Sequence, residues 1–457
     1  MDSWIFLHIP IEYWQQRWID NYKAIFDAWE DGGVRGLAVG RLHFRQEDGS
    51  FVRAFQPDPK VYEACGVTPP APEPRNPDRE AKLQEILDNA AGRGWPIMIF
   101  DTPGGGGALP LDQDPYGEAR FRAAAQDVMR AFPQAQGVIM DGPGEQHYEL
   151  AWHHGGEILQ MRSDESNRFA ALGYDLDRLQ RGIDHLRTSF RQLTPARVRY
   201  HAEGGLLAGL NLFDINEDAL YWLRARQQTA LGSMQMLRRA VDALDRKTTL
   251  GGIPRITSWS SLTGQNYQRM APLFDYIFPK HYYWHRGFDG MYGTVQRWVQ
   301  KFGQWNPTLL EADCFRLVEN LFGLRLPGVE SLLDMERGFP AAFFDELVQS
   351  ETARALAAIG DADKTIFWVS ASAREPHAGD AMTGRDLQGI LSATQAAGGK
   401  RFLFHPEPAM NAPAWHVISR MCGNPWNEAT SAYWPEDTWS ESVEGYGAHF
   451  RSAQKRG

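Results

Sequence analysis

The chain has 457 residues, 43% hydrophobic and 23% charged, which is enough for one large α/β domain or for two or three smaller ones. A net charge of −10 argues against nucleic acid or an anionic membrane as the main binding partner. The cysteines Cys65, Cys314 and Cys422 stand in no metal-binding spacing and imply no disulfide framework.

The first residues carry no secretion signal, because Met1-Asp2-Ser3-Trp4 lacks a basic segment and the apolar run is short. No apolar run approaches membrane-spanning length. We therefore expect a soluble, cytoplasmic protein with no membrane or nucleic-acid partner, and the sequence does not give its oligomeric state. The 16 Trp, 15 Tyr and 24 Phe also suit a cleft that binds the apolar faces of sugars, and Trp284 and Trp368 fit either that role or the core.

Strand and helix signals alternate from the first residues onward. Residues 4–9 are the first predicted strand, and a helix follows in which large apolar residues recur every three or four positions. The second strand is predicted over 36–44, where two glycines indicate close packing or a bulge. The proline-rich residues 46–77 are predicted to be a long loop, and Asp78 is the expected N-cap of the next helix.

The third and fourth predicted strands both end on an acid. The third covers 96–101, and the four glycines at 104–107 lack the following Lys-Ser/Thr of a phosphate-binding loop, so no nucleotide cofactor is expected. A helix over 116–132 leads into the fourth strand, 137–141, whose apolar residues close on Asp141. A Gly-Pro-Gly turn and a second acid follow. Acids that end buried parallel strands lie where α/β proteins place their chemistry.

Between about 150 and 250 the alternation pauses. One amphipathic helix is predicted over 172–190, and Asn216 is the expected N-cap of another, with a Gly-rich loop at 203–210 between them. Because neither helix covers its own apolar face, we interpret the region as an enlarged helical layer and not as a new domain.

The alternation then resumes. The last four predicted strands cover 254–260, 275–284, 364–370 and 401–405. A helical excursion at 305–360 separates strands six and seven. Thr383 and Asp386 resemble a capping box at the start of the helix between strands seven and eight.

Eight buried strands separated by helices favour a (β/α)8 TIM barrel with helical insertions after strands 4 and 6. We assign residues 1–425 to this barrel domain and 426–457 to a C-terminal tail packed on it. An open doubly wound sheet is the alternative, and the missing phosphate-binding fingerprints count against it.

In a barrel the residues that end the strands converge on one mouth, so we predict a pocket for a polar substrate there. The expected substrate-binding residues are His8, Arg41, His43, Asp101, Tyr148, Trp259, Lys280, His281, Trp284 and His405. Each has a structural alternative. A lone histidine such as His8 or His43 is more often a hydrogen-bonded core residue, and Lys280 could pair with Asp275 or Asp141.

Cleavage of a glycosidic bond needs two carboxyl groups, about 5–5.5 Å apart for retention and about 6.5–9.5 Å for inversion. Asp141 and Glu145 flank the Gly-Pro-Gly turn and could stand at either distance. Asp141 is the candidate nucleophile or base. Glu145 is the candidate acid, because a site beside Tyr148 and other aromatic residues favours a protonated carboxyl group. Other candidate partners for Asp141 are Glu407, Glu375 and Asp101.

The segment Asp141-Gly142-Pro143-Gly144-Glu145, with Tyr148-Glu149 beyond it, resembles uncharacterised glycosyl hydrolase families with a TIM-barrel fold. Residues 172–179 and 222–226 also resemble the helices that follow strand four in those families, so the likeness covers the central third of the chain. It implies a carbohydrate-active hydrolase with a strand-four aspartate nucleophile. The chain departs from the large retaining clan that has Asn-Glu after strand four and Glu at the end of strand seven, because strand seven here ends in Ser370-Ala371-Ser372.

Two other classes of function remain. A metal-dependent barrel hydrolase or isomerase could take ligands from His8, His43, His281, His405, Asp101 and Asp141, but no His-x-His or His-Glu-x-x-His spacing supports it, and we expect no metal. A non-catalytic carbohydrate-binding barrel would use the aromatic residues and not the acids.

Overall fold

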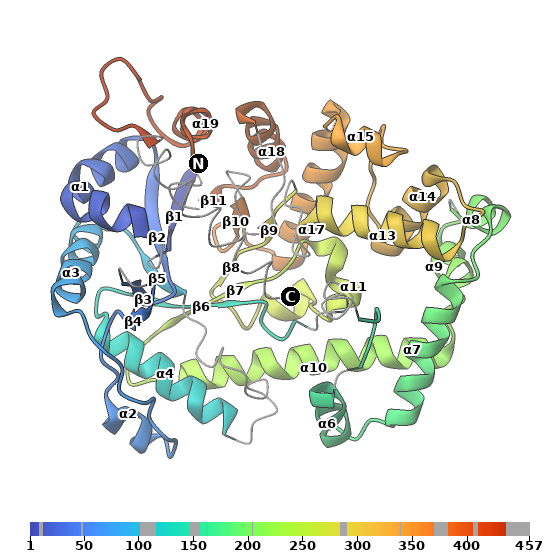
Figure 1. Cartoon of the computed structure of the whole chain (residues 1–457), viewed down its shortest axis with the longest axis horizontal. Helices are drawn as coiled ribbons and strands as arrows, with labels where there is room; N and C mark the ends of the chain where they lie inside the picture. The colour runs from blue at the N-terminus through green and yellow to red at the C-terminus, as the bar shows by residue number, and fades with distance from the viewer. Residues whose placement is uncertain are drawn as a thin grey trace.

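The computed structural model describes residues 1–8, 12–46, 49–100, 116–145, 148, 156–161, 163–202, 204–283, 290–338, 340–369, 383–404 and 410–435. A curled sheet of nine parallel strands lies at the centre of this part of the chain, and helices surround it (Figure 1). The strand order is β8-β7-β6-β5-β2-β1-β11-β10-β9. The fold is consistent with an α/β barrel.

The strands of this sheet are short. They are β1 (Asp2–His8), β2 (Val34–Gly40), β5 (Ile97–Phe100), β6 (Gly137–Asp141), β7 (Thr249–Ile253), β8 (Tyr276–Ile277), β9 (Lys280–His281), β10 (Ile366–Val369) and β11 (Arg401–Phe404). A separate antiparallel pair consists of β3 (His43–Arg45) and β4 (Phe51–Arg53).

The segment that carries β8 and β9 bonds to both of its neighbours. Phe278 directly follows β8, and its amide donates to the carbonyl of Gly252 in β7 at 2.8 Å. The amide of Trp368 in β10 donates to the carbonyl of Pro279 at 2.9 Å. Parallel pairing therefore passes from β7 through this one segment to β10. Pro279 has no amide hydrogen, which is why the predicted strand 275–284 appears as two short pieces.

Helices follow most of the strands. The first half of the chain contributes α1 (Glu12–Asp31), α2 (Pro59–Ala64), α3 (Pro77–Gly92), α4 (Gly117–Ala131), α6 (Ser163–Ala171), α7 (Leu176–Phe190), α8 (Pro195–His201), α9 (Leu206–Leu212) and α10 (Glu217–Asp242). The 26-residue α10 contacts both α4 and α7, and it runs below the sheet in the view of Figure 1.

The second half adds η1 (Thr257–Trp259), α11 (Ser260–Thr263), α12 (Tyr267–Met270), α13 (Met291–Trp305), α14 (Glu311–Phe322), α15 (Leu332–Glu336), α16 (Ala341–Phe343), η2 (Phe344–Val348), α17 (Gln349–Ile359), α18 (Gly384–Ala396) and α19 (Ala412–Cys422). Across the described residues no helix combines the length and the apolar character needed to cross a bilayer.

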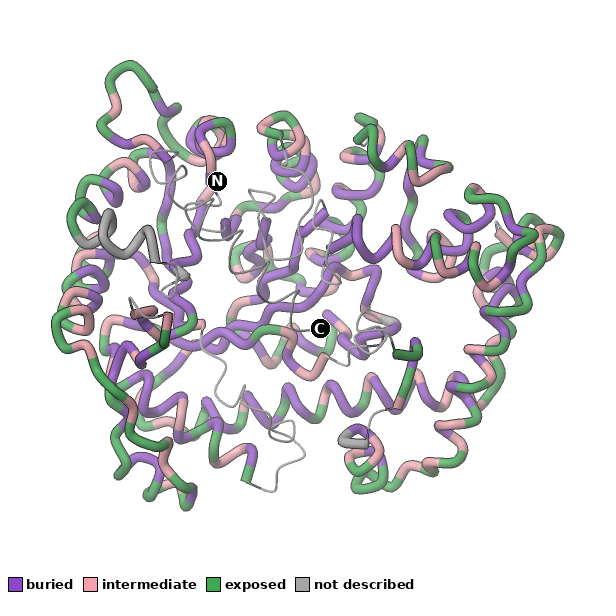
Figure 2. The backbone as a smooth tube through the Cα atoms, viewed as in Figure 1, coloured by how far each residue is buried: buried purple, intermediate pink, exposed green. Residues whose placement is uncertain are grey.

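Successive side chains of a strand point to opposite faces of the sheet, so the sheet has a core on each face. Figure 2 shows the central strands buried. The inner core consists of Trp4, Phe6, Ala38, Met98, Ile139, Ile253, Phe278, Tyr282, Ile366, Trp368 and Leu403. The outer core lies between sheet and helices and takes the intervening residues, such as Ile5 and Phe367. A Cβ atom added at Gly36 or Gly40 would collide with the ring of Trp4 or Phe6, so the close packing predicted at these glycines is confirmed.

Several elements follow the prediction closely. The fourth strand ends on Asp141, Asn216 caps α10 by accepting from the amide of Ala219, and Thr383 and Asp386 form a capping box on α18. These features depend on local hydrogen bonds and periodicity, which the sequence carries directly.

Other predictions were wrong. The second strand ends at Gly40, Arg41 has a left-handed backbone with φ 47°, and His43 belongs to the separate β3–β4 pair. The proline-rich stretch 46–77 is no simple loop, because it contains β4 and α2. Proline is well suited to the first turn of a helix, as Pro59 shows in α2.

The starts of two helices and the position of one strand also differ from the prediction. Asn76, and not Asp78, caps α3. The predicted loop 203–210 contains the start of α9. The fifth strand lies at 249–253 and not at 254–260, where η1 begins after a short connection. Gly251 and Gly252 conceal this strand in the sequence, and they are small because Phe278 and Phe274 fill the adjacent space.

Candidate active site

The carboxylate of Asp141 lies at the end of β6 and keeps 40% of its side-chain surface exposed. Its backbone pairs in register with Ile253 of β7, and the next amide, that of Gly142, donates to the carbonyl of Ile253 at 2.9 Å. The strand therefore fixes Asp141 and leaves its carboxylate accessible to a ligand.

Lys280 reaches Asp141 from β9, which shares one segment of the chain with β8, and β8 pairs with β7 beside β6. Its ammonium nitrogen lies 2.9 Å from Oδ1 of Asp141, and only 5% of its side chain is exposed. This pairing was one of the two structural alternatives for Lys280. Asp275, the other, instead accepts from Arg238 at 2.9 Å. A buried ammonium beside a carboxylate stabilises the ionised acid, which is the form a nucleophile or base requires.

Four aromatic side chains continue the inner core from this ion pair. Lys280 lies 6.0 Å from the ring centre of Tyr282, and Tyr282 lies 5.8 Å from Trp368. Phe6 and Phe100 meet at 5.1 Å, and both also contact Trp368. We call Phe6, Phe100, Tyr282 and Trp368 the aromatic layer. Phe6, Tyr282 and Trp368 are at most 5% exposed, so this edge-to-face packing fills the inner core and offers little surface to a substrate.

Three members of the aromatic layer were not among the predicted site residues: Phe6, Phe100 and Tyr282. Period-two alternation could have found the first two, since Phe6 follows Trp4 and Phe100 follows Met98 by two residues, and Trp4 and Met98 face the inner core. Arg255, which is described next, was also missed.

The side chain of Glu145 is buried and pairs with Arg255. Its Oε1 lies 2.6 Å from Nε of Arg255, and 2% of the Glu145 side chain and none of the Arg255 side chain is exposed. Tyr148, which is 2% exposed, lies with its ring 5.6 Å from the guanidinium carbon of Arg255. A substrate cannot reach these three side chains as they stand, so we do not retain Glu145 as the acid or Tyr148 as a substrate contact.

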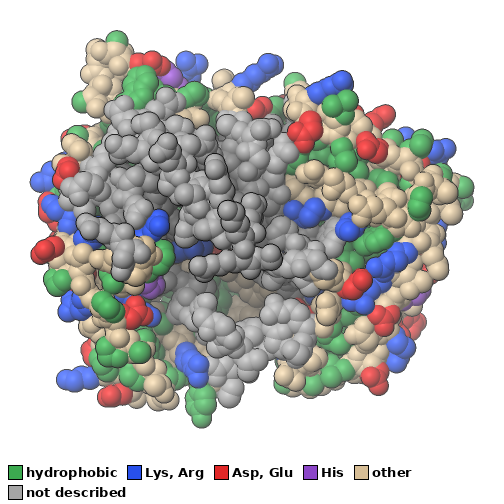
Figure 3. Space-filling model, in the orientation of Figure 1, with side chains coloured by type: hydrophobic (Ala, Val, Ile, Leu, Met, Phe, Trp, Pro, Cys, Tyr) green, Lys and Arg blue, Asp and Glu red, His purple; other side chains and the backbone are tan. Residues whose placement is uncertain are grey.

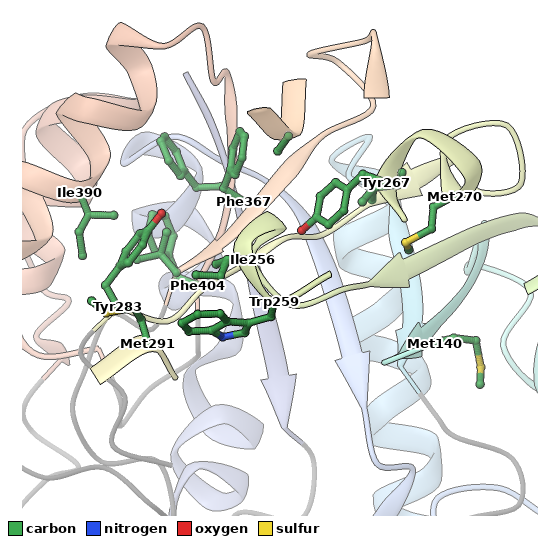
Figure 4. Packing of buried hydrophobic residues seen from close by; sticks show 14 of the residues in the cluster. Met140, Ile256, Trp259, Tyr267, Met270, Tyr283, Met291, Phe367, Ile390 and Phe404 are labelled. Atoms are coloured by element: carbon green, nitrogen blue, oxygen red, sulfur yellow. The ribbon is translucent and has the colours of Figure 1, made fainter. Parts of the chain in front are cut away.

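Trp259 and His281 are fully buried in the outer core. Trp259 lies in η1 and packs on Phe322 with ring centres 4.2 Å apart, and Figure 4 shows it among other buried hydrophobic residues. His281 contacts the rings of Tyr283 and Phe367, and burial lowers its pKa to about 3. It follows Lys280 by one residue and therefore points to the opposite side of the sheet.

Of the remaining predicted site residues, the structure describes some and leaves the others outside the described residues. Arg41 is exposed at the end of β2, and His43 is half-buried in β3. The structure describes the backbone of His8, which ends β1. Asp101, Trp284, His405 and Glu407 lie outside the described residues, as does Glu375.

Within the described residues, no group of three or more His, Cys, Asp or Glu side chains is arranged to hold a metal ion. On the face shown in Figure 3, acidic and basic side chains of the described residues are interspersed and do not gather in one patch.

The sequence matches no protein-family model and no curated protein. Among solved structures, the β-galactosidase of the psychrophilic Marinomonas ef1 aligns at 10% identity and a TM-score of 0.46, over 92% of this chain and 59% of that chain. The β-galactosidase of Halorubrum lacusprofundi aligns at 11% identity and a TM-score of 0.47, over 92% and 57%. A GH18 chitinase of Pseudoalteromonas aurantia aligns at 9% identity and a TM-score of 0.39, over 92% and 98%. The chain thus spans less than two thirds of either β-galactosidase, and at these TM-scores the likeness establishes neither its fold nor its function.

Proposed function

We propose that the protein is a carbohydrate-active hydrolase built on a (β/α)8 barrel, with Asp141 as the nucleophile or base. The observation that carries this proposal is the accessible carboxylate of Asp141, held at the end of β6 by the buried ammonium of Lys280 at 2.9 Å. A carboxylate that a strand end positions and a buried cation holds is the kind of group that acts as nucleophile or base in the cleavage of a glycosidic bond.

The barrel interpretation counts β8 and β9 as one strand, because their common segment bonds to β7 on one side and β10 on the other. Residues 1–425 then form one barrel domain, with insertions after strands four and six, and 426–457 form its tail.

The second carboxyl group is proposed to be Glu407, which follows the end of β11 by three residues. In the strand order, β11 is the fourth strand from β6 in either direction when β8 and β9 count as one. Strands opposite each other in a barrel present their carboxyl ends across its mouth, as a pair of catalytic acids requires. Glu145 is not available for this role because Arg255 holds it in the interior.

The test is turnover of a panel of aryl glycosides by wild type, Asp141→Asn and Glu407→Gln. We expect Asp141→Asn to lower kcat by at least about 10³-fold while sugar binding survives. Glu407→Gln should lose activity mainly on substrates with poor leaving groups, because these need a proton from the acid.

Asp275→Asn is the matched control. Asp275 is also a half-exposed acid paired with a basic residue, but it precedes β8 and so lies at the amino end of the sheet. Its substitution should leave kcat unchanged. Full turnover by Asp141→Asn would refute the assignment.

A non-catalytic carbohydrate-binding barrel is the second candidate. It is favoured by one observation, the burial of Glu145, which removes the acid nearest to Asp141 in the sequence. In that case wild type and Asp141→Asn bind glycans equally, and neither turns them over.

A further inference from the structure

The turn that follows Asp141 has two residues in the left-handed backbone region, Gly142 with φ 52° and Gly144 with φ 65°. The amide of Glu145 closes the turn by donating to the carbonyl of Gly142 at 2.8 Å. Glycine adopts this conformation easily but does not enforce it, so contacts from outside the turn must select it.

Arg255 is linked to the turn in two ways, directly through its side chain and indirectly through Gln265. Its Nε lies 2.6 Å from Oε1 of Glu145, and its amide donates at 3.2 Å to the side-chain oxygen of Gln265. The side-chain nitrogen of Gln265 in turn donates to the carbonyl of Pro143 at 3.4 Å. The side chain of Arg255 thus holds the end of the turn, and its backbone holds Gln265, which bonds the middle of the turn.

Arg255 is itself fixed in place. The hydroxyl of Tyr267 donates to its carbonyl, and its guanidinium lies 5.6 Å from the ring of Tyr148. None of its side chain is exposed. A buried ion pair adds little net stability because both charges lose their hydration, so its geometry is the more informative property.

The helical insertion closes the turn from the other side. Gly144 lies against α10, where an added Cβ atom would meet the carbonyl oxygen of Ala230. Arg226 of the same helix is fully buried and donates to the carbonyl of Leu262 at 3.0 Å. Desolvation lowers the pKa of Arg226 to about 10, while the charges of Glu165 and Glu145 oppose that shift, so it remains a cation near neutral pH.

We infer that Arg255 is a positioning residue for the proposed reaction: it holds the turn directly at Glu145 and through Gln265 at Pro143, and thereby sets the direction of the Asp141 carboxylate toward Lys280. This inference rests on the proposed function. It assigns Glu145 to support of the nucleophile and not to proton donation. The expected signature is a loss in kcat larger than the change in KM, because misplacing a reacting group by about 1 Å costs roughly 10²-fold in rate.

The test compares Arg255→Met, Arg255→Lys and the double variant Glu145→Gln/Arg255→Met with wild type. Arg255→Met should lower kcat about 10- to 100-fold with KM changed less than about threefold. Arg255→Lys keeps the charge, folds more readily and should recover part of kcat. The double variant removes both charges and should recover thermal stability but not kcat.

Arg199→Met is the matched control, because Arg199 of α8 bonds the buried carboxylate of Asp313 in α14 at 3.1 Å, away from β6. It should lower the melting temperature and leave kcat unchanged. If Arg255→Met lowers only the melting temperature and keeps kcat, or if the double variant recovers kcat together with stability, the positioning role is refuted.

Amide hydrogen exchange of residues 137–145 and 249–256 tests whether Arg255 holds the turn, and it requires no enzymatic activity. Arg255→Met should accelerate exchange in both segments, whereas Arg199→Met should not. If wild type turns over no glycoside, the proposed function fails, and exchange alone then decides. Faster exchange at 137–145 supports the inference that Arg255 holds the turn, and unchanged exchange there overturns it.

Discussion

The ion pair of Asp141 and Lys280 combines one accessible and one buried charge, and this asymmetry determines what each residue can do. Asp141, with 40% of its side chain exposed, stays solvated when its partner is lost, whereas Lys280 is 5% exposed. Lys280 therefore orients and stabilises the carboxylate that is proposed to meet the substrate.

Replacing Lys280 with Met tests this division. We expect a loss of about 1 kcal/mol or less in the free energy of unfolding, because Asp141 is half exposed, but a fall of about 10²-fold in kcat. Denaturant unfolding and steady-state kinetics measure the two quantities. Lys400→Met, which breaks the exposed pair with Asp363, is the control and should change neither; an unaltered kcat in Lys280→Met would contradict the role.

His281 makes a prediction for acid stability. Burial lowers its pKa from 6.5 to about 3, so the folded protein keeps it neutral while the unfolded chain takes up a proton below pH 6.5. The stability that neutral His281 contributes to the folded state is fully present above pH 6.5 and is lost progressively as the pH falls toward 3. At pH 5 this loss is about 2 kcal/mol.

His281→Phe has no titrating group there, and a ring still fills the space between Tyr283 and Phe367. The difference in unfolding free energy between pH 7 and pH 5 should therefore be about 2 kcal/mol smaller in the variant than in wild type. An identical pH dependence of the two proteins would show that another group dominates acid unfolding.

At the scale of elements, the contact of the β6 turn with α10 depends on Gly144. It has φ 65°, and a Cβ atom would meet the backbone of Ala230. Gly144→Ala should lower the free energy of unfolding by at least about 2 kcal/mol, of which about 1–2 kcal/mol comes from the left-handed backbone. Thermal or denaturant unfolding provides the measurement.

Gly173→Ala separates the two contributions. Gly173 also has a positive φ, 79°, but no atom lies within 4 Å of its added Cβ. It should show the backbone cost of about 1–2 kcal/mol alone. Equal losses for both variants would mean that α10 moves away from the turn without cost.

Elements were predictable where their signal is local. The end of β6 on Asp141 and the capping box of Thr383 follow from neighbouring residues. β7 was misplaced because its two glycines give a weak strand signal, and they are there only because Phe274 and Phe278 occupy the adjacent space. That reason lies on another strand segment and cannot be read from residues 249–253.

At the scale of the whole molecule, the end of the described chain covers its beginning. The indole nitrogen of Trp29 in α1 donates to the hydroxyl of Tyr433 at 2.9 Å, and Tyr433 packs on Trp415 of α19. Trp426 is 8% exposed and Tyr433 is 4% exposed. This contact joins helices from the two ends of the sequence.

A chain that ends after residue 425 loses both side chains. We expect its free energy of unfolding to fall by about 3–6 kcal/mol, since burying one large apolar side chain contributes about 1.5–3 kcal/mol and two are lost. Thermal unfolding measures the loss. A chain that ends after residue 435 keeps Trp426 and Tyr433 and is the matched control; equal melting temperatures for the two would contradict a structural role of these residues.

The amino-acid sequence alone determined the alternation of strands and helices, the amphipathic faces and the acid that closes β6, because periodicity and capping are set by residues a few positions apart. Tertiary structure alone decided the partners: Asp141 pairs with Lys280, and Glu145 pairs with Arg255. These contacts join residues far apart in the chain, and they depend on strand register and on how the sheet curls, which no local pattern encodes.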